Sequence, residues 1–93
     1  MAATPFSIVP QARRFSHEQA LRVSSIALGE RNADTVVIDL KYATDATTSG
    51  FARLVLLRRL LRARGRDLRL VNLRDRTAHL YELNRLARVL PLG

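Results

Sequence analysis

The segment from Thr35 to Phe51 most constrains how this chain of 93 residues can fold. It begins with Thr35–Leu40, a continuous β-branched and apolar run that is typical of a strand buried on both faces of a sheet. Thr47-Thr48-Ser49-Gly50 follows, and a long apolar and basic helix is expected over Ser49–Arg64. A strand followed by a helix of this length predicts a crossover connection, and therefore a parallel sheet.

The rest of the chain predicts the same alternation. The further expected elements are strands at Phe6–Val9, Leu68–Leu73 and Arg88–Leu90, and helices at His17–Leu28 and Arg76–Asn84. Ser16 and Gln19 form a capping-box pattern, and Asp75 is expected to cap the last helix. The order β-α-β-α-β-α-β predicts an α/β fold with one domain over residues 1–93. Its sheet should be mainly parallel, with four strands, or five if the N-terminal region supplies another, and with helices mostly on one face.

Composition argues against several kinds of site. The chain has no cysteine, which excludes disulfides, zinc thiolates and thiol nucleophiles. His17 and His79 are isolated, and there is no P-loop or Ser/His/Asp arrangement, so no metal, cofactor or catalysis is expected. No apolar run approaches the roughly 18 residues that span a bilayer. Because Met1–Pro5 does not resemble a signal peptide, a cytoplasmic location is expected.

The net positive charge of the chain comes from its second half. Residues 1–45 carry five basic and five acidic side chains, whereas residues 46–93 carry eleven arginines and three acidic groups, so the whole net charge of +8 lies there. Such a surface suits an acidic protein, nucleic acid or an anionic membrane, or it is simply solvated. No DNA-binding pattern or set of stacking aromatic residues is visible, so a nucleic-acid role would rest on charge alone.

The helix expected at Ser49–Arg64 carries two apolar stripes. The inner stripe, spaced to pack on a core, consists of Phe51, Leu54, Val55, Leu57 and Leu61. The outer stripe, Ala52-Leu56-Leu60-Ala63, is turned away from it and rimmed by arginines. It is either a docking face for a partner or a second copy, or it packs beneath a neighbouring helix. If it is exposed, a monomer or a weak homodimer is expected, because opposed arginines resist self-association.

The hydroxyl residues at the start of this helix have two interpretations. One of Thr47, Thr48 and Ser49 is expected to cap the helix by accepting a hydrogen bond from a backbone N–H. The same unpaired N–H groups and the helix dipole would also stabilise a phosphate, bound or covalently attached. Arg53 could pair with a phosphate on Thr48 only if its side chain folds back.

Taken together, these features resemble the STAS domain. This family includes bacterial anti-sigma factor antagonists and the cytoplasmic domains of sulfate-type anion transporters. The resemblance covers residues 16–92 and rests on four segments: the strand Val36–Leu40, the turn Thr47–Phe51, the strand Leu68–Asn72 and the tail Leu80–Pro91. The family normally has two strands before its first helix, whereas this chain has room for one clear strand.

The resemblance implies a non-enzymatic regulatory domain similar to an anti-sigma factor antagonist, in which Thr48 accepts phosphate from a partner kinase. The residues expected to bind the partner are Thr47, Thr48, Ser49, Gly50, Arg53, Leu56 and Leu60. An accessory subunit that contacts the ATPase of a lipid-trafficking ABC transporter is the alternative. The family usually has aspartate where Thr47 stands and commonly glycine where Arg85 stands, so Asn84 is expected to adopt the left-handed conformation instead.

Overall fold

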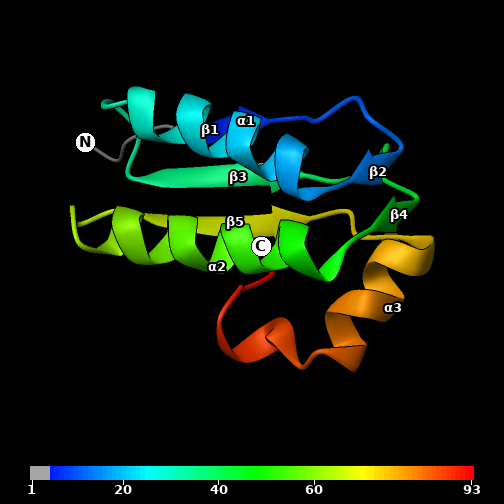
Figure 1. Cartoon of the computed structure of the whole chain (residues 1–93). Coiled ribbons are helices and arrows are strands. Elements are labelled where there is room, and N and C mark those ends of the chain that lie inside the picture. Colours follow the sequence, from blue (N-terminus) through cyan, green and yellow to red (C-terminus); the bar gives the residue numbers. More distant parts are fainter. Residues whose placement is uncertain (1–4) are drawn as a thin grey trace.

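Parallel strands joined by helices form the frame of the structure, a computed structural model that describes residues 5–93 (Figure 1). The elements are β1 (Phe6–Ile8), β2 (Arg14–Phe15), α1 (His17–Gly29), β3 (Thr35–Asp39), β4 (Asp45–Ala46), α2 (Thr48–Arg62), β5 (Asp67–Val71), α3 (Asp75–Leu83) and the 3₁₀ turn η1 (Leu86–Arg88). β1, β3 and β5 form a parallel sheet in that order, and β2 pairs with β4 in a separate parallel ribbon. The predicted α/β architecture is confirmed.

The strand order explains where the helices lie. β1, β3 and β5 follow one another across the sheet in chain order, so successive crossovers move in the same direction. Right-handed crossovers that move in one direction place their helices on the same face of the sheet. Figure 1 accordingly shows α1 and α2 side by side along the sheet, while α3 lies at its end, next to β4.

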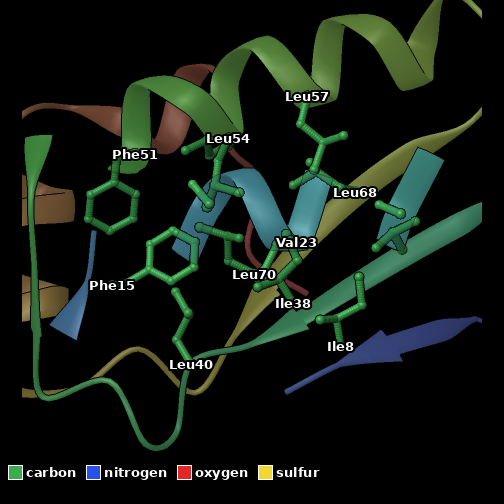
Figure 2. Close-up of a cluster of buried hydrophobic side chains, with 14 of the residues drawn as sticks. Ile8, Phe15, Val23, Ile38, Leu40, Phe51, Leu54, Leu57, Leu68 and Leu70 are labelled. Atoms are coloured by element: carbon green, nitrogen blue, oxygen red, sulfur yellow. The ribbon is translucent and has the colours of Figure 1, made fainter. Parts of the chain in front are cut away.

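The hydrophobic core fills the space between the sheet and the helices α1 and α2 (Figure 2). Its largest fully buried side chains include Phe15, Ile38, Leu40, Phe51, Leu54, Leu57, Leu61, Leu68 and Leu70. Within β3, Val36 and Ile38 are fully buried, but Val37 between them is only half-buried. The prediction that this strand is buried on both faces is wrong, because α1 and α2 cover the same face.

The last part of the sheet also differs from the prediction. The main sheet has three strands, and the expected strand Arg88–Leu90 is replaced by η1 and a single bridge between Leu70 and Leu92. The contacts of Leu90 explain this difference. Its side chain is fully buried, and its carbonyl accepts a hydrogen bond of 2.7 Å from the Tyr81 hydroxyl of α3, so this carbonyl is not paired with β5. The chain therefore reaches β5 only after residue 90. The N-terminal region does supply a second strand before the first helix, β2, where the sequence had room for one clear strand, but β2 pairs with β4 and not with the main sheet.

The two ends of α3 need correction as well. Asp75 is the first residue of the helix and not its cap, and the N-cap residue, Arg74, makes no side-chain capping bond. The start of α3 is held from outside, where the Thr77 hydroxyl donates a hydrogen bond of 2.7 Å to the Ala43 carbonyl. This contact is not a cap, because the hydroxyl donates; the Arg76 N–H in the first turn of α3 instead donates a hydrogen bond of 3.1 Å to the Thr44 carbonyl.

At the other end of α3, Arg85 adopts the left-handed conformation, with φ of 53° and ψ of 43°. Asn84, which was expected to do so, stays at φ of −91°. Its side-chain amide donates a hydrogen bond of 2.9 Å to the Leu80 carbonyl, one helical turn back. Asn84 thus remains with the helix, and the reversal of the chain falls on the next residue.

An ion pair fastens α2 to β5. Arg58 Nε donates to Asp67 Oδ1 at 2.8 Å, and Nη1 of the same guanidinium donates to the Val89 carbonyl at 3.2 Å. Burial by itself would raise the pKa of Asp67, but hydrogen bonds from Arg58 and the Leu68 N–H, together with nearby positive charge, hold that pKa below its usual value. The Arg58 guanidinium therefore links α2, β5 and the C-terminal segment.

This ion pair predicts a dependence of stability on pH. A carboxylate whose pKa is lower in the folded than in the unfolded chain stabilises the fold above the unfolded pKa, and the effect is lost as the pH falls through the folded pKa. We expect the wild type to lose this contribution below about pH 4. Asp67→Asn should cost about 1 kcal/mol at pH 7, a modest value because the pair is partly exposed. Urea denaturation between pH 2 and 7 measures both effects, and equal pH dependence in the two proteins would contradict them.

Candidate functional site

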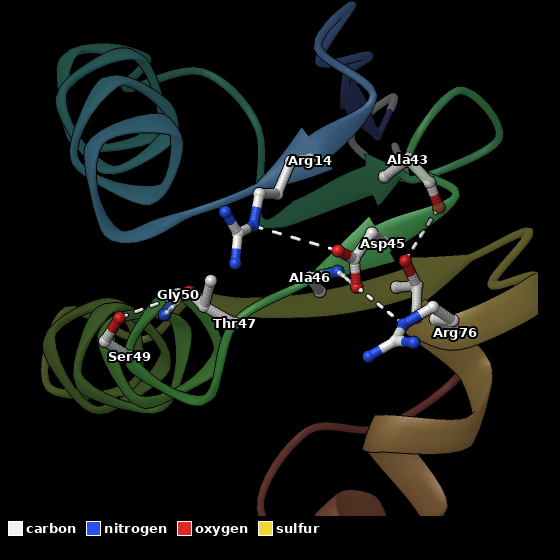
Figure 3. A network of polar contacts seen from close by, with 9 residues as sticks. Arg14, Ala43, Asp45, Ala46, Thr47, Ser49, Gly50 and Arg76 are labelled. Atoms are coloured by element: carbon white, nitrogen blue, oxygen red, sulfur yellow. Dashed lines mark hydrogen bonds and ion pairs between the residues drawn. The ribbon is translucent and has the colours of Figure 1, made fainter.

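The junction between β4 and α2 brings the hydroxyl cluster to the surface (Figure 3). Thr47 is the N-cap of α2: its Oγ1 accepts a hydrogen bond of 3.0 Å from the Gly50 N–H and lies 3.2 Å from Ser49 Oγ. Thr48 is the first residue of the helix, and its side chain is exposed. Within residues 5–93, its hydroxyl makes no side-chain hydrogen bond. Capping therefore engages Thr47 and leaves Thr48 accessible.

Strand β2 fixes the position of this junction. The Thr47 N–H donates to the Phe15 carbonyl at 3.1 Å, and the Asp45 N–H donates to the Arg13 carbonyl at the same distance. Gly50 packs against the same segment, since a Cβ added there would lie 2.6 Å from the Phe15 carbonyl oxygen. Gly50 is buried, so it contributes to packing and not to the exposed surface that the sequence predicted for it.

Asp45, in β4, is bound by arginines from two other elements. Its Oδ2 lies 3.8 Å from Arg14 Nε, and its Oδ1 accepts a hydrogen bond of 3.3 Å from Arg76 Nε. Figure 3 shows the two arginines reaching this carboxylate from β2 and α3. Sequence reasoning missed this cluster, because β2 is only two residues long and leaves no alternating pattern.

The outer stripe of α2 is exposed. Leu56 and Leu60 keep 38% and 41% of their surface accessible, and Ala52 and Ala63 are exposed as well. The alternative that this stripe packs beneath a neighbouring helix is therefore wrong. The inner stripe is buried as predicted, except that Val55 is half-buried at its edge.

The edges of the outer stripe are cationic. α2 contains four arginines and no acidic residue. Arg58 and Arg62 lie within 4 Å of the Asp67 carboxylate, whereas Arg53 and Arg59 make no ion pair within residues 5–93. Arg53, which is also among the predicted partner-binding residues, is half-buried. The outer stripe, with Arg53 and Arg59 beside it, suits a partner surface that is apolar and carries acidic groups at its rim.

Residues 5–93 contain no group of three or more His, Cys, Asp or Glu side chains placed to hold a metal ion. In the same part of the chain, no helix combines the length and the apolar character that crossing a membrane requires.

A parallel sheet with an exposed hydroxyl at the start of its second long helix is the arrangement that the resemblance implied. The family model of the STAS domain matches residues 12–93. The chain belongs to the STAS domain family. The match begins four residues before the predicted range of 16–92 and extends one residue beyond it, so it takes in all of β2. No curated protein matches the chain.

The close packing of this STAS domain at Gly50 predicts a large effect of a single methyl group. Gly50→Ala should destabilise the fold by about 1–3 kcal/mol, because the new Cβ must push β2 and α2 apart. Gly29→Ala is the matched control, since a Cβ at that helical position meets nothing within 4 Å. Urea denaturation compares the two variants, and equal stabilities would contradict the packing argument.

Proposed function

We propose that this STAS domain is a non-enzymatic regulatory module that binds another protein through the start and the outer stripe of α2, and that phosphorylation of Thr48 controls this contact. The observation that carries the proposal is the contrast between two adjacent hydroxyl groups. Thr47 is held as the N-cap, whereas Thr48 is exposed and makes no side-chain hydrogen bond in the described residues. A kinase can therefore reach Thr48 without breaking the cap.

The proposed surface continues from the hydroxyl residues along one side of α2. Thr48 and Ser49 are exposed at the first turn, and Leu56 and Leu60 are exposed on the following turns. A phosphate on Thr48 adds about 1.5–2 negative charges. Removing those charges from water inside an interface is costly unless the partner neutralises them. Phosphorylation at one end of the surface would therefore weaken a complex that the leucines stabilise.

The outer stripe favours a protein over the nucleic acid or anionic membrane that charge alone would allow. Exposed leucines between arginines match the composition of protein interfaces, whereas binding to nucleic acid is supplied mainly by contacts between basic side chains and phosphates. Strong retention on heparin that disappears at physiological salt, without any stable protein complex, would instead support the basic module.

The identity of the partner divides the proposal into two versions. An anti-sigma factor kinase would both bind the surface and phosphorylate Thr48. The ATPase of a lipid-trafficking ABC transporter would bind the same surface without a phosphate switch. The absence of the family's usual aspartate, replaced here by Thr47, is consistent with this second version. Gene neighbourhood separates them: a sigma factor and kinase support the first version, and an ATPase and permease support the second.

The switch predicts opposite results for two substitutions at Thr48. Thr48→Glu should lower the affinity for the native partner at least tenfold, whereas Thr48→Ala should bind that partner within about twofold of the wild-type affinity. The two variants should therefore differ by more than ~1 kcal/mol in binding free energy. Calorimetry with the partner purified from the native cells measures both. Ser25→Glu, which adds the same charge at an exposed position of α1, is the control and should bind normally. Wild-type affinity for both Thr48 variants would exclude the switch.

The outer stripe predicts a second, independent loss of binding. Leu56→Glu combined with Leu60→Glu should leave the fold intact, because both side chains are already accessible, but should reduce partner binding and any weak dimer. Sedimentation and circular dichroism measure assembly and folding. Leu83→Glu, at a leucine of α3 that is 68% exposed, should change neither. An unfolded double variant would mean that the stripe belongs to the core.

A further inference from the structure

Arg14 is held loosely at the edge of the phosphorylation site. Its Nε lies 3.8 Å from Asp45 Oδ2, which is the long end of the range for an ion pair, and its side chain is 68% exposed. Asp45 has a closer partner, because Arg76 Nε donates a hydrogen bond of 3.3 Å to its other oxygen. Arg14 can therefore leave Asp45 without stranding an unpaired carboxylate.

The pairing of β2 with β4 places Arg14 beside the segment that leads to Thr48. Arg14 lies opposite Asp45 in the parallel register, and the Thr47 N–H is bound to the carbonyl of the residue after Arg14. Thr48 follows Asp45 by three residues, so at most about 10 Å of chain separates them. Arg53, the arginine nearest to Thr48 in the sequence, lies about 140° further round the helix, since each residue turns about 100°. Arg14 is better placed than Arg53 to meet a phosphate there.

We propose that Arg14 is the internal receptor for the phosphate on Thr48: it exchanges the Asp45 carboxylate for the phosphate, while Asp45 stays paired with Arg76. This inference rests on the proposed phosphorylation of Thr48. A phosphate dianion is a stronger acceptor for a guanidinium than a partly exposed carboxylate already shared with another arginine. In this exchange the Arg14 guanidinium neutralises part of the negative charge of the phosphate. The guanidinium is then no longer an exposed and loosely paired cation at this end of the molecule.

Asp45 opposes the phosphate in this arrangement. It competes for Arg14, and its own negative charge lies on the strand that leads to Thr48. Removing that charge should strengthen the Arg14–phosphate contact, whereas removing Arg14 should abolish it. The two substitutions therefore have opposite expected effects, which a general loss of structure would not produce.

The test uses the full chain carrying phosphoserine at position 48, installed by codon expansion, and follows the phosphate by ³¹P NMR between pH 4 and 8. The second pKa of an exposed phosphoserine is about 6. An arginine nearby stabilises the dianion, so we expect a lower value in the otherwise wild-type chain. Arg14→Gln should raise it by about half a unit, and Asp45→Asn should lower it further.

Arg13→Gln is the matched control, because it removes the same charge one residue away from Arg14, at an exposed side chain with no ion pair in residues 5–93. Its phosphate should titrate like that of the wild type. Equal titration in the Arg14→Gln and wild-type chains, or an equal shift in Arg13→Gln, would overturn the proposal. Failure of the proposed function would look different: protein from its native cells would carry no phosphate on Thr48, while the titration of the installed phosphate would be unaffected.

Discussion

The carbonyl group of Phe15 makes the contacts on which the junction between β4 and α2 depends. It accepts a hydrogen bond from the Thr47 N–H, and Gly50 leaves room for it where a Cβ would lie only 2.6 Å away. The ring of the same residue is fully buried in the core. Phe15 thus ties the start of α2 both to β2 and to the core, and these contacts fix the position of the hydroxyl cluster.

The two stripes of α2 differ in burial: the inner one belongs to the core and the outer one is exposed. The inner stripe, with Leu54 and Leu61 fully buried, supplies the helix with its share of the core. The outer stripe adds nothing to that core, and in a domain of this size its leucines are accessible for docking. The arginines beside it keep an apolar surface in contact with water and disfavour pairing with an identical, equally basic face. These properties support the proposed binding of a different protein.

The charged side chains around Thr48 come together in space and not along the chain. The family's usual acidic residue stands next to the phosphoacceptor, whereas here that position is Thr47, which serves as the N-cap. The nearest acidic group is Asp45, and it is held by arginines from β2 and α3. A phosphate on Thr48 would meet a local balance of charge that three separate elements set.

The sequence by itself determined the alternation of strands and helices, the N-caps at Ser16 and within the hydroxyl cluster, and the two stripes of α2, because hydrophobic periodicity and capping are local properties. Only the tertiary structure decided that the outer stripe is exposed, that Thr47 caps and Thr48 stays accessible, and that Arg14 lies opposite Asp45. It also replaced the strand at Arg88–Leu90 with a 3₁₀ turn and gave Arg85 the left-handed conformation. These features depend on tertiary contacts, such as Tyr81 with Leu90 and Thr77 with Ala43, which no local pattern encodes.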